Sequence, residues 1–104
     1  MPILSISRLF GIAVRNRRMA AGLSQEKLAD GAGLHPTYVS MVERGVRNPT
    51  LNVSARIAKA LKVSLQILIE EAQQQGDTAK LEQRMSAPRE TKRRQKTERV
   101  PKAR

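Results

Sequence analysis

Residues 25–44 read QEKLADGAGLHPTYVSMVER and set the architecture of the chain. Ala29 is the fifth of these twenty residues and Gly33 the ninth, while Val39 and Val42 are the fifteenth and eighteenth. A small side chain lets a second helix cross over the first, and glycine supplies the positive φ of the turn between them. The two valines, three residues apart, form the inward face of the second helix. The spacing predicts a helix-turn-helix unit whose outward face fits a DNA major groove about 12 Å wide.

Three further helices are predicted around this unit, because the periodicity is helical from Ser7 to Gln75 and lacks strand-like alternation. Ser24, His35, Thr50 and Ser64 stand at helix starts as N-caps, and Pro36 takes the first position after His35. The result is a compact all-α domain of five short helices. The predicted helices cover residues 8–21, 25–32, 36–44, 51–61 and 65–74.

The first helix is expected to place Phe10, Val14 and Ala21 on one inward stripe, and Gly22 ends it. Gly31 lies inside the second helix, where it costs about 0.5–1 kcal/mol relative to alanine. The 104 residues are enough for one small domain with this modest core and a tail.

The amino-acid composition excludes most kinds of catalytic and metal site. The chain has no cysteine, which excludes disulfides and thiolate metal sites, and its one histidine, His35, cannot make a multi-histidine metal site. No metal, cofactor or catalytic residue is therefore expected. The net charge of +11 favours a polyanionic partner. The only aromatic residues are Phe10 and Tyr38, so recognition of single strands by base stacking is poorly supported.

Residues 76–104 hold half of the 20 lysines and arginines but few large apolar residues, Leu81 and Val100 among them. Too little apolar surface remains to offset chain entropy, so this segment is predicted to be a largely disordered basic tail that begins at Gly76. The run from Arg89 to Lys96 has two interpretations: a basic arm for phosphates, or a solvated tail with no specific role.

The N-terminal segment has no acidic residue before Glu26, a composition also found in transit peptides. It runs without a break into the first predicted helix, so we interpret it as part of the domain. No stretch approaches the roughly 18 apolar residues of a membrane span. The expected location is the cytoplasm, without membrane attachment.

Four short stretches stand out in and around the predicted helix-turn-helix: Gly22-Leu23-Ser24-Gln25-Glu26, Leu28-Ala29, Glu43-Arg44-Gly45 and Asn48-Pro49-Thr50-Leu51. With these markers, residues 9–72 resemble the lambda-repressor/Cro-like helix-turn-helix family, also called the xenobiotic-response-element family. The resemblance implies a five-helix lambda-repressor-like DNA-binding domain over 9–72, with its helix-turn-helix motif at 25–44 and the basic tail at 76–104. A weaker resemblance, carried by residues 37–40, 42–45 and 47–48, is to the small controller proteins of restriction–modification operons.

This resemblance assigns roles to individual residues. Gln25 would bind a phosphate at the N-terminus of the second helix, and residues 36–44 would form the recognition helix. Arg18 would pair with Glu43 and hold the first helix against the third. The expected contacts to double-stranded DNA are Gln25, Pro36, Thr37, Tyr38, Ser40, Met41, Arg44, Arg47 and Asn48. The expected structural residues are Arg18, Ala29, Gly33, Val39, Val42 and Glu43.

Two positions depart from the family pattern. Pro36 stands where the family often has Gln or Arg, and Ser54 stands where the fourth helix usually has an apolar side chain. Specificity must therefore depend more on the neighbours of Pro36.

Several of these residues also have simpler interpretations. Arg44 and Arg47 are either DNA contacts or solvated cations, and Tyr38 either reaches DNA or packs on the domain surface. Met41 either contacts a thymine methyl group or is an ordinary surface methionine. His35 is interpreted as a helix cap rather than a ligand or a base.

The last predicted helix suggests a homodimer. Leu65 and Leu68 would face the core, whereas Ile67 and Ile69 are left more outward than a small domain tolerates. We expect Leu65, Ile67 and Ile69 to form a two-fold interface, which would place two recognition helices about 34 Å apart on a palindromic operator.

The sequence thus favours a non-enzymatic, sequence-specific transcriptional regulator that binds double-stranded DNA. One alternative is an antitoxin of the same fold, which would bind a toxin partner through its tail and autoregulate its operon. Another is a basic protein associated with RNA or the ribosome.

Overall fold

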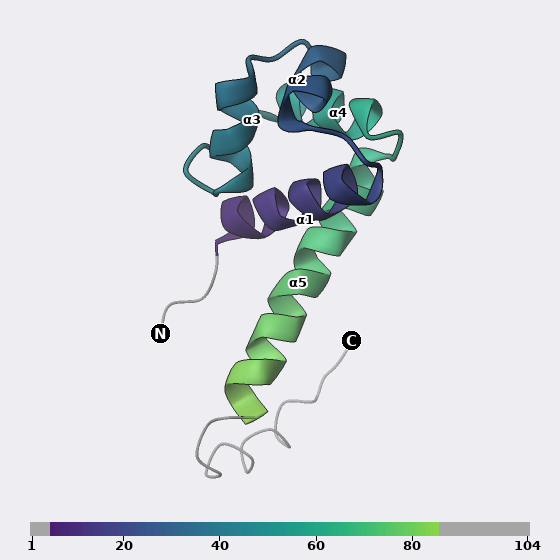
Figure 1. Cartoon of the computed structure of the whole chain (residues 1–104). Helices are drawn as coiled ribbons and strands as arrows, with labels where there is room; N and C mark the ends of the chain where they lie inside the picture. Colours follow the sequence, from purple (N-terminus) through teal and green to yellow (C-terminus); the bar gives the residue numbers. More distant parts are fainter. Residues whose placement is uncertain (1–4, 86–104) are drawn as a thin grey trace.

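The computed structural model describes residues 5–85, which form five helices and no strand (Figure 1). The predicted all-α, five-helix fold is confirmed. None of the helices within the described range is long and apolar enough to cross a membrane. The helices are α1 (Ile6–Ala20), α2 (Gln25–Ala32), α3 (Pro36–Glu43), α4 (Leu51–Ala60) and α5 (Leu65–Met85).

Polar side chains begin the helices, as the sequence predicts. The hydroxyls of Ser24 and Thr50 accept the backbone N–H groups of Lys27 and Val53. Ser64 caps α5 in the same way, because its Oγ accepts the N–H of Ile67 at 3.1 Å. Each cap satisfies one of the N–H groups that the first helical turn leaves without a partner.

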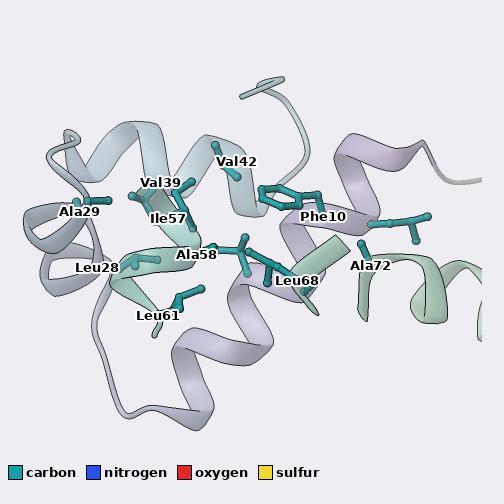
Figure 2. Close-up of a cluster of buried hydrophobic side chains, with 14 residues drawn as sticks. Phe10, Leu28, Ala29, Val39, Val42, Ile57, Ala58, Leu61, Leu68 and Ala72 are labelled. Carbon is teal, nitrogen blue, oxygen red and sulfur yellow. The ribbon is translucent and has the colours of Figure 1, made fainter. Parts of the chain in front are cut away.

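The core lies where the five helices meet (Figure 2). Helix α1 packs against both α3 and α5, while α4 packs against α2 and α5. Ser54 is also buried, and its hydroxyl donates to the Thr50 carbonyl at 2.8 Å, which satisfies the polar group at this position. The largest fully buried side chains are Val14, Leu28, Val39, Val42, Ile57 and Leu68.

Helix α5 is longer than predicted. The sequence places its end near Gln74 and the start of a disordered tail at Gly76, but the helix continues to Met85. Gly76 does not end it, because this glycine packs on α1: a Cβ there would lie 2.9 Å from Leu9 Cδ1. Residues 79–85 are AKLEQRM, all favourable helix formers. Residues 86–104, which include the basic run 89–96, lie outside the described residues.

Two smaller predictions are also corrected. Ala21 does not belong to the inward stripe of α1; it is exposed at the C-cap, because the helix ends at Ala20 and the chain turns away at Gly22. Ile69 is half-buried against the core rather than outward.

The close approach of α1 to α3 makes Gly11 sensitive to substitution. A Cβ at Gly11 would overlap the Val42 carbonyl oxygen and lie 2.8 Å from that of Glu43. Gly11→Ala is expected to lower the free energy of unfolding by about 1–3 kcal/mol, because backbone must move to make room.

Gly31→Ala is the matched control for Gly11→Ala. Its Cβ would meet only Ala60 Cβ, at 3.4 Å, and alanine favours a helix interior by about 1 kcal/mol. Its stability in urea unfolding is expected to be unchanged or higher. Equal losses in the two variants would contradict the tight α1–α3 crossing.

An ion pair joins α1 to α5 on the surface. Arg17 Nε and Nη2 donate to Glu71 Oε1 and Oε2 at 3.0 and 2.5 Å. These bonds hold the pKa of Glu71 below its usual value of 4.5. Because the folded-state pKa is depressed, the stabilisation is present above the unfolded pKa and is lost as the pH falls through the folded pKa.

Glu71→Gln is therefore expected to make the loss of stability below about pH 5 shallower, with only a slight loss at neutral pH. Unfolding midpoints measured across the acid range check this. Glu70→Gln is the control, because Glu70 lies on the same helix but forms no ion pair in the part of the chain with described side chains. If both variants showed the same shallower loss of stability at low pH, the Arg17–Glu71 pair would not be its cause.

Candidate nucleic-acid interface

The turn between α2 and α3 is built from small residues. Gly33 ends α2 with φ 70° and ψ 38°, a left-handed conformation that glycine adopts without strain. The Leu34 N–H then donates to the Ala29 carbonyl at 2.8 Å. Ala29 is buried beneath the crossing, where a larger side chain would push α3 away. The turn therefore fixes the angle at which α3 leaves α2.

Arg56 of α4 stabilises this turn, a role that the sequence does not reveal. Its Nε donates to the Ala32 carbonyl at 3.0 Å and its Nη2 to the Gly33 carbonyl at 2.7 Å. A guanidinium at the C-terminus of α2 satisfies carbonyls that have no intrahelical partner and opposes the negative end of the helix dipole. No local signal marks Arg56, because its partners lie 23 and 24 residues earlier.

Helix α3 has one buried face and one accessible face. Val39, Val42 and Glu43 are buried against the domain. Thr37 and Arg44 are exposed, and Pro36, Tyr38, Ser40 and Met41 are half-buried. The domain therefore does not enclose the side of α3 to which the DNA contacts are assigned.

The start of α3 depends on His35 and Pro36. His35 Nδ1 accepts the Thr37 N–H at 3.1 Å, and Pro36 takes the first helical position, where a missing N–H costs little. His35 thus has a structural function as a cap, which accounts for the one histidine of the chain.

Arg47 lies over the ring of Tyr38, with its guanidinium carbon 5.5 Å from the ring centroid. Tyr38 in turn packs against the hydrophobic core. This cation–π contact places the Arg47 side chain beside α3 instead of leaving it free in the loop. Tyr38 therefore packs on the domain, one of its two interpretations, and its contact with DNA stays a prediction.

Arg18 and Glu43 form a buried ion pair between α1 and α3. Arg18 Nε and Nη2 donate to the two carboxylate oxygens of Glu43 at 2.6 and 3.1 Å, and Nη1 donates to the Leu23 carbonyl at 2.8 Å. The side chains are 11% and 2% exposed. The hydrogen bond to Glu43 raises the pKa of Arg18, so the guanidinium is charged at every physiological pH.

Gln25 joins this pair from the start of α2. Its Nε2 donates to Glu43 Oε1 at 3.0 Å, so the same carboxylate connects three helices. The predicted phosphate contact of Gln25 stays a prediction, and the structure adds an inward contact that the sequence did not suggest. Asn48, the last of the predicted DNA contacts, accepts a hydrogen bond from the Ser7 hydroxyl.

The charge around α3 is positive. The ion pairs among the described side chains are Arg17–Glu71 and Arg18–Glu43, so neither Arg44 nor Arg47 is neutralised by a carboxylate there. No group of three metal-ligating side chains occurs within the same part of the chain. The surface at α3 can therefore attract an anion.

The residues predicted for dimerisation do not form one exposed face. Ile67 is 40% exposed, whereas Leu65 and Ile69 are partly buried against the core of their own chain. Ile67 is thus the apolar residue of this set that is most available to a second copy.

Removing one partner of the buried pair is expected to destabilise the folded protein strongly. Arg18→Met would leave the Glu43 carboxylate buried without its guanidinium, which typically costs about 3–5 kcal/mol. The double variant Arg18→Met/Glu43→Leu removes both charges of the pair. Its free energy of unfolding should therefore fall by less than that of Arg18→Met alone. Chemical unfolding of both variants measures the difference. A fully stable Arg18→Met variant would contradict this role.

The matches of this chain with known proteins agree on one family. The family model described as Helix-turn-helix matches residues 14–68, just over half of the chain. Control protein C.BamHI of Bacillus amyloliquefaciens is 45% identical over 67 residues, which cover 64% of this chain and 83% of that protein.

An uncharacterised HTH-type transcriptional regulator of Mycobacterium tuberculosis is 43% identical over 58 residues, or 56% of this chain. The match spans only 41% of that regulator's length. The crystal structure of the clp gene regulator ClgR from C. glutamicum aligns with a TM-score of 0.70 at 27% identity, over 72% of this chain and 96% of that one. The chain therefore belongs to the Cro/repressor-type helix-turn-helix family of transcriptional regulators.

Proposed function

We propose that this protein is a transcriptional regulator that binds double-stranded DNA in a sequence-specific manner, with α3 as its recognition helix. The observation that carries the proposal is the division of α3 into two faces. Val39 and Val42 are fully buried, while Thr37 is exposed and Ser40 and Met41 remain partly accessible. A helix held by one face, with small polar and apolar side chains on the other, suits direct readout in the major groove.

The charges support the same proposal. Arg44 and Arg47 follow the accessible face of α3, and the Tyr38 ring holds Arg47 beside it. A contact from Arg44 to phosphate would give affinity and register, while a bidentate contact from Arg47 to guanine would give sequence preference. Binding should weaken steeply with salt, because each phosphate contact releases counterions.

A homodimer on a palindromic operator completes the proposal. Ile67, exposed on α5, is the residue we place at the centre of the interface, with Leu65 and Ile69 at its border. Two copies related by a two-fold axis would present two α3 helices to successive major grooves. Capture of a separate small protein through the tail, as an antitoxin requires, is the competing outcome.

Selection of bound duplexes from a random pool tests specificity and symmetry together. A palindromic consensus is expected, and sedimentation with a duplex carrying that consensus should give two protein chains per duplex. Recovery of no consensus would overturn the sequence-specific function. A consensus without symmetry, bound by one chain, would overturn only the dimer.

Arg47→Ala is expected to weaken binding to the selected duplex by about 1–3 kcal/mol. The substitution removes both a cation and the group stacked on Tyr38. Lys59→Ala removes one charge from the exposed end of α4 and serves as the control in a fluorescence titration at fixed salt. Wild-type affinity in Arg47→Ala would refute the assigned role.

A further inference from the structure

The first turn of α1 lies against the end of α3 (Figure 1). Arg8 Nη1 donates to the carbonyl oxygen of Arg44, the C-cap residue of α3, at 2.7 Å. The last carbonyls of a helix have no intrahelical partner and carry partial negative charge, so a guanidinium is well suited to bind there. Arg8 thus caps the C-terminus of the recognition helix, although it lies 36 residues earlier in the sequence than Arg44.

Two neighbouring contacts extend this attachment into the loop after α3. Gly45, with φ 77°, packs so closely on α1 that a Cβ would lie 2.9 Å from both Cα and Cδ of Arg8. One residue before Arg8, the Ser7 hydroxyl donates to Asn48 Oδ1. The segment from Arg44 to Asn48 is therefore held at its start, its second residue and its end by the first turn of α1.

The loop has few other fixed points. Its backbone bonds to α3 are Arg44 N–H to the Ser40 carbonyl at 3.1 Å, and Gly45 N–H to the Val42 carbonyl and Val46 N–H to the Met41 carbonyl, both at 3.0 Å. Beyond these, Arg47 stacks on the Tyr38 ring at 5.5 Å. A guanidinium that reads a base must be held within a fraction of an ångström, and its supporting contacts determine that position.

We propose that Arg8 and Ser7 form a positioning pair, which fixes the loop 44–48 and so sets where Arg47 lies relative to α3. The inference rests on the proposed DNA-binding function and adds two residues that contribute to specificity without reading a base. Ser7 is neutral, so its contribution comes from the placement of Asn48 and not from attraction to phosphate.

A simple phosphate contact by Arg8 would have a different signature. Such a contact lowers affinity for every duplex by a similar factor and reduces the salt slope. Loss of positioning instead lowers affinity for the selected duplex more than for an unrelated duplex. The ratio of these two affinities therefore separates the two roles.

The experiment compares Arg8→Met, Ser7→Ala and Arg15→Met in the full chain. Arg8→Met keeps the apolar stem on which Gly45 packs and removes the guanidinium. Arg15→Met removes the same charge from the same helix, and Arg15 is exposed with no hydrogen bond from its side chain in the described structure. Affinities are measured for the duplex selected above and for an unrelated duplex of equal length, across a salt series. Amide hydrogen exchange at Gly45 and Val46 is measured in the free protein.

Positioning predicts that Arg8→Met and Ser7→Ala each lower the affinity ratio about fivefold or more, with the Ser7→Ala salt slope unchanged. Exchange at Gly45 and Val46 should accelerate in both variants and stay at the wild-type rate in Arg15→Met. If Arg8→Met is too unstable to study, Ser7→Ala, which deletes a single oxygen, carries the test.

An unchanged ratio in Ser7→Ala, or equal effects of Arg8→Met and Arg15→Met on both duplexes, would overturn the proposal. So would faster exchange without any change in the ratio, because the loop would then be held without affecting specificity. If the wild-type protein prefers no duplex, the proposed function fails. In that case the exchange rates still show separately whether the pair holds the loop.

Discussion

The carboxylate of Glu43 is the point on which the arrangement of the helix-turn-helix depends. It accepts hydrogen bonds from Arg18 of α1 and Gln25 of α2 while lying in α3 itself. A buried carboxylate is costly without partners, so the three helices can satisfy it in only a narrow range of relative positions. Helix α3 has eight residues, too few to be stable alone in water. Its orientation must therefore come from such contacts and from the valines on its inner face.

Local chemistry is what the sequence could predict well. Caps, turn glycines and inward valines act within a few residues, so the helix-turn-helix and the inward position of Val39 and Val42 follow from spacing alone. Gly76 shows where this reasoning stops. In sequence a glycine before a polar, charged segment resembles a helix end, but here it makes room for Leu9, 67 residues earlier. Only the three-dimensional packing of α1 on α5 distinguishes the two cases.

The candidate site also has one part that the sequence predicts and one part that it does not. The accessible face of α3 could be predicted because it is the complement of Val39 and Val42. The contacts that hold the site were not predictable: Arg56 on the α2 terminus, Arg8 on the α3 terminus and Ser7 on Asn48 all join residues more than twenty positions apart. Gln25 was assigned outward by resemblance, and the structure shows its amide also turned toward Glu43. A motif identifies which residues matter, whereas their partners depend on tertiary structure.

The length of α5 has a consequence for the outline of the described structure. At about 1.5 Å per residue its 21 residues extend roughly 31 Å, and its far end points away from α2 and α3 (Figure 1). The two ends of α5 therefore lie in different surroundings: the first turns belong to the folded body, and the last turns project beyond it.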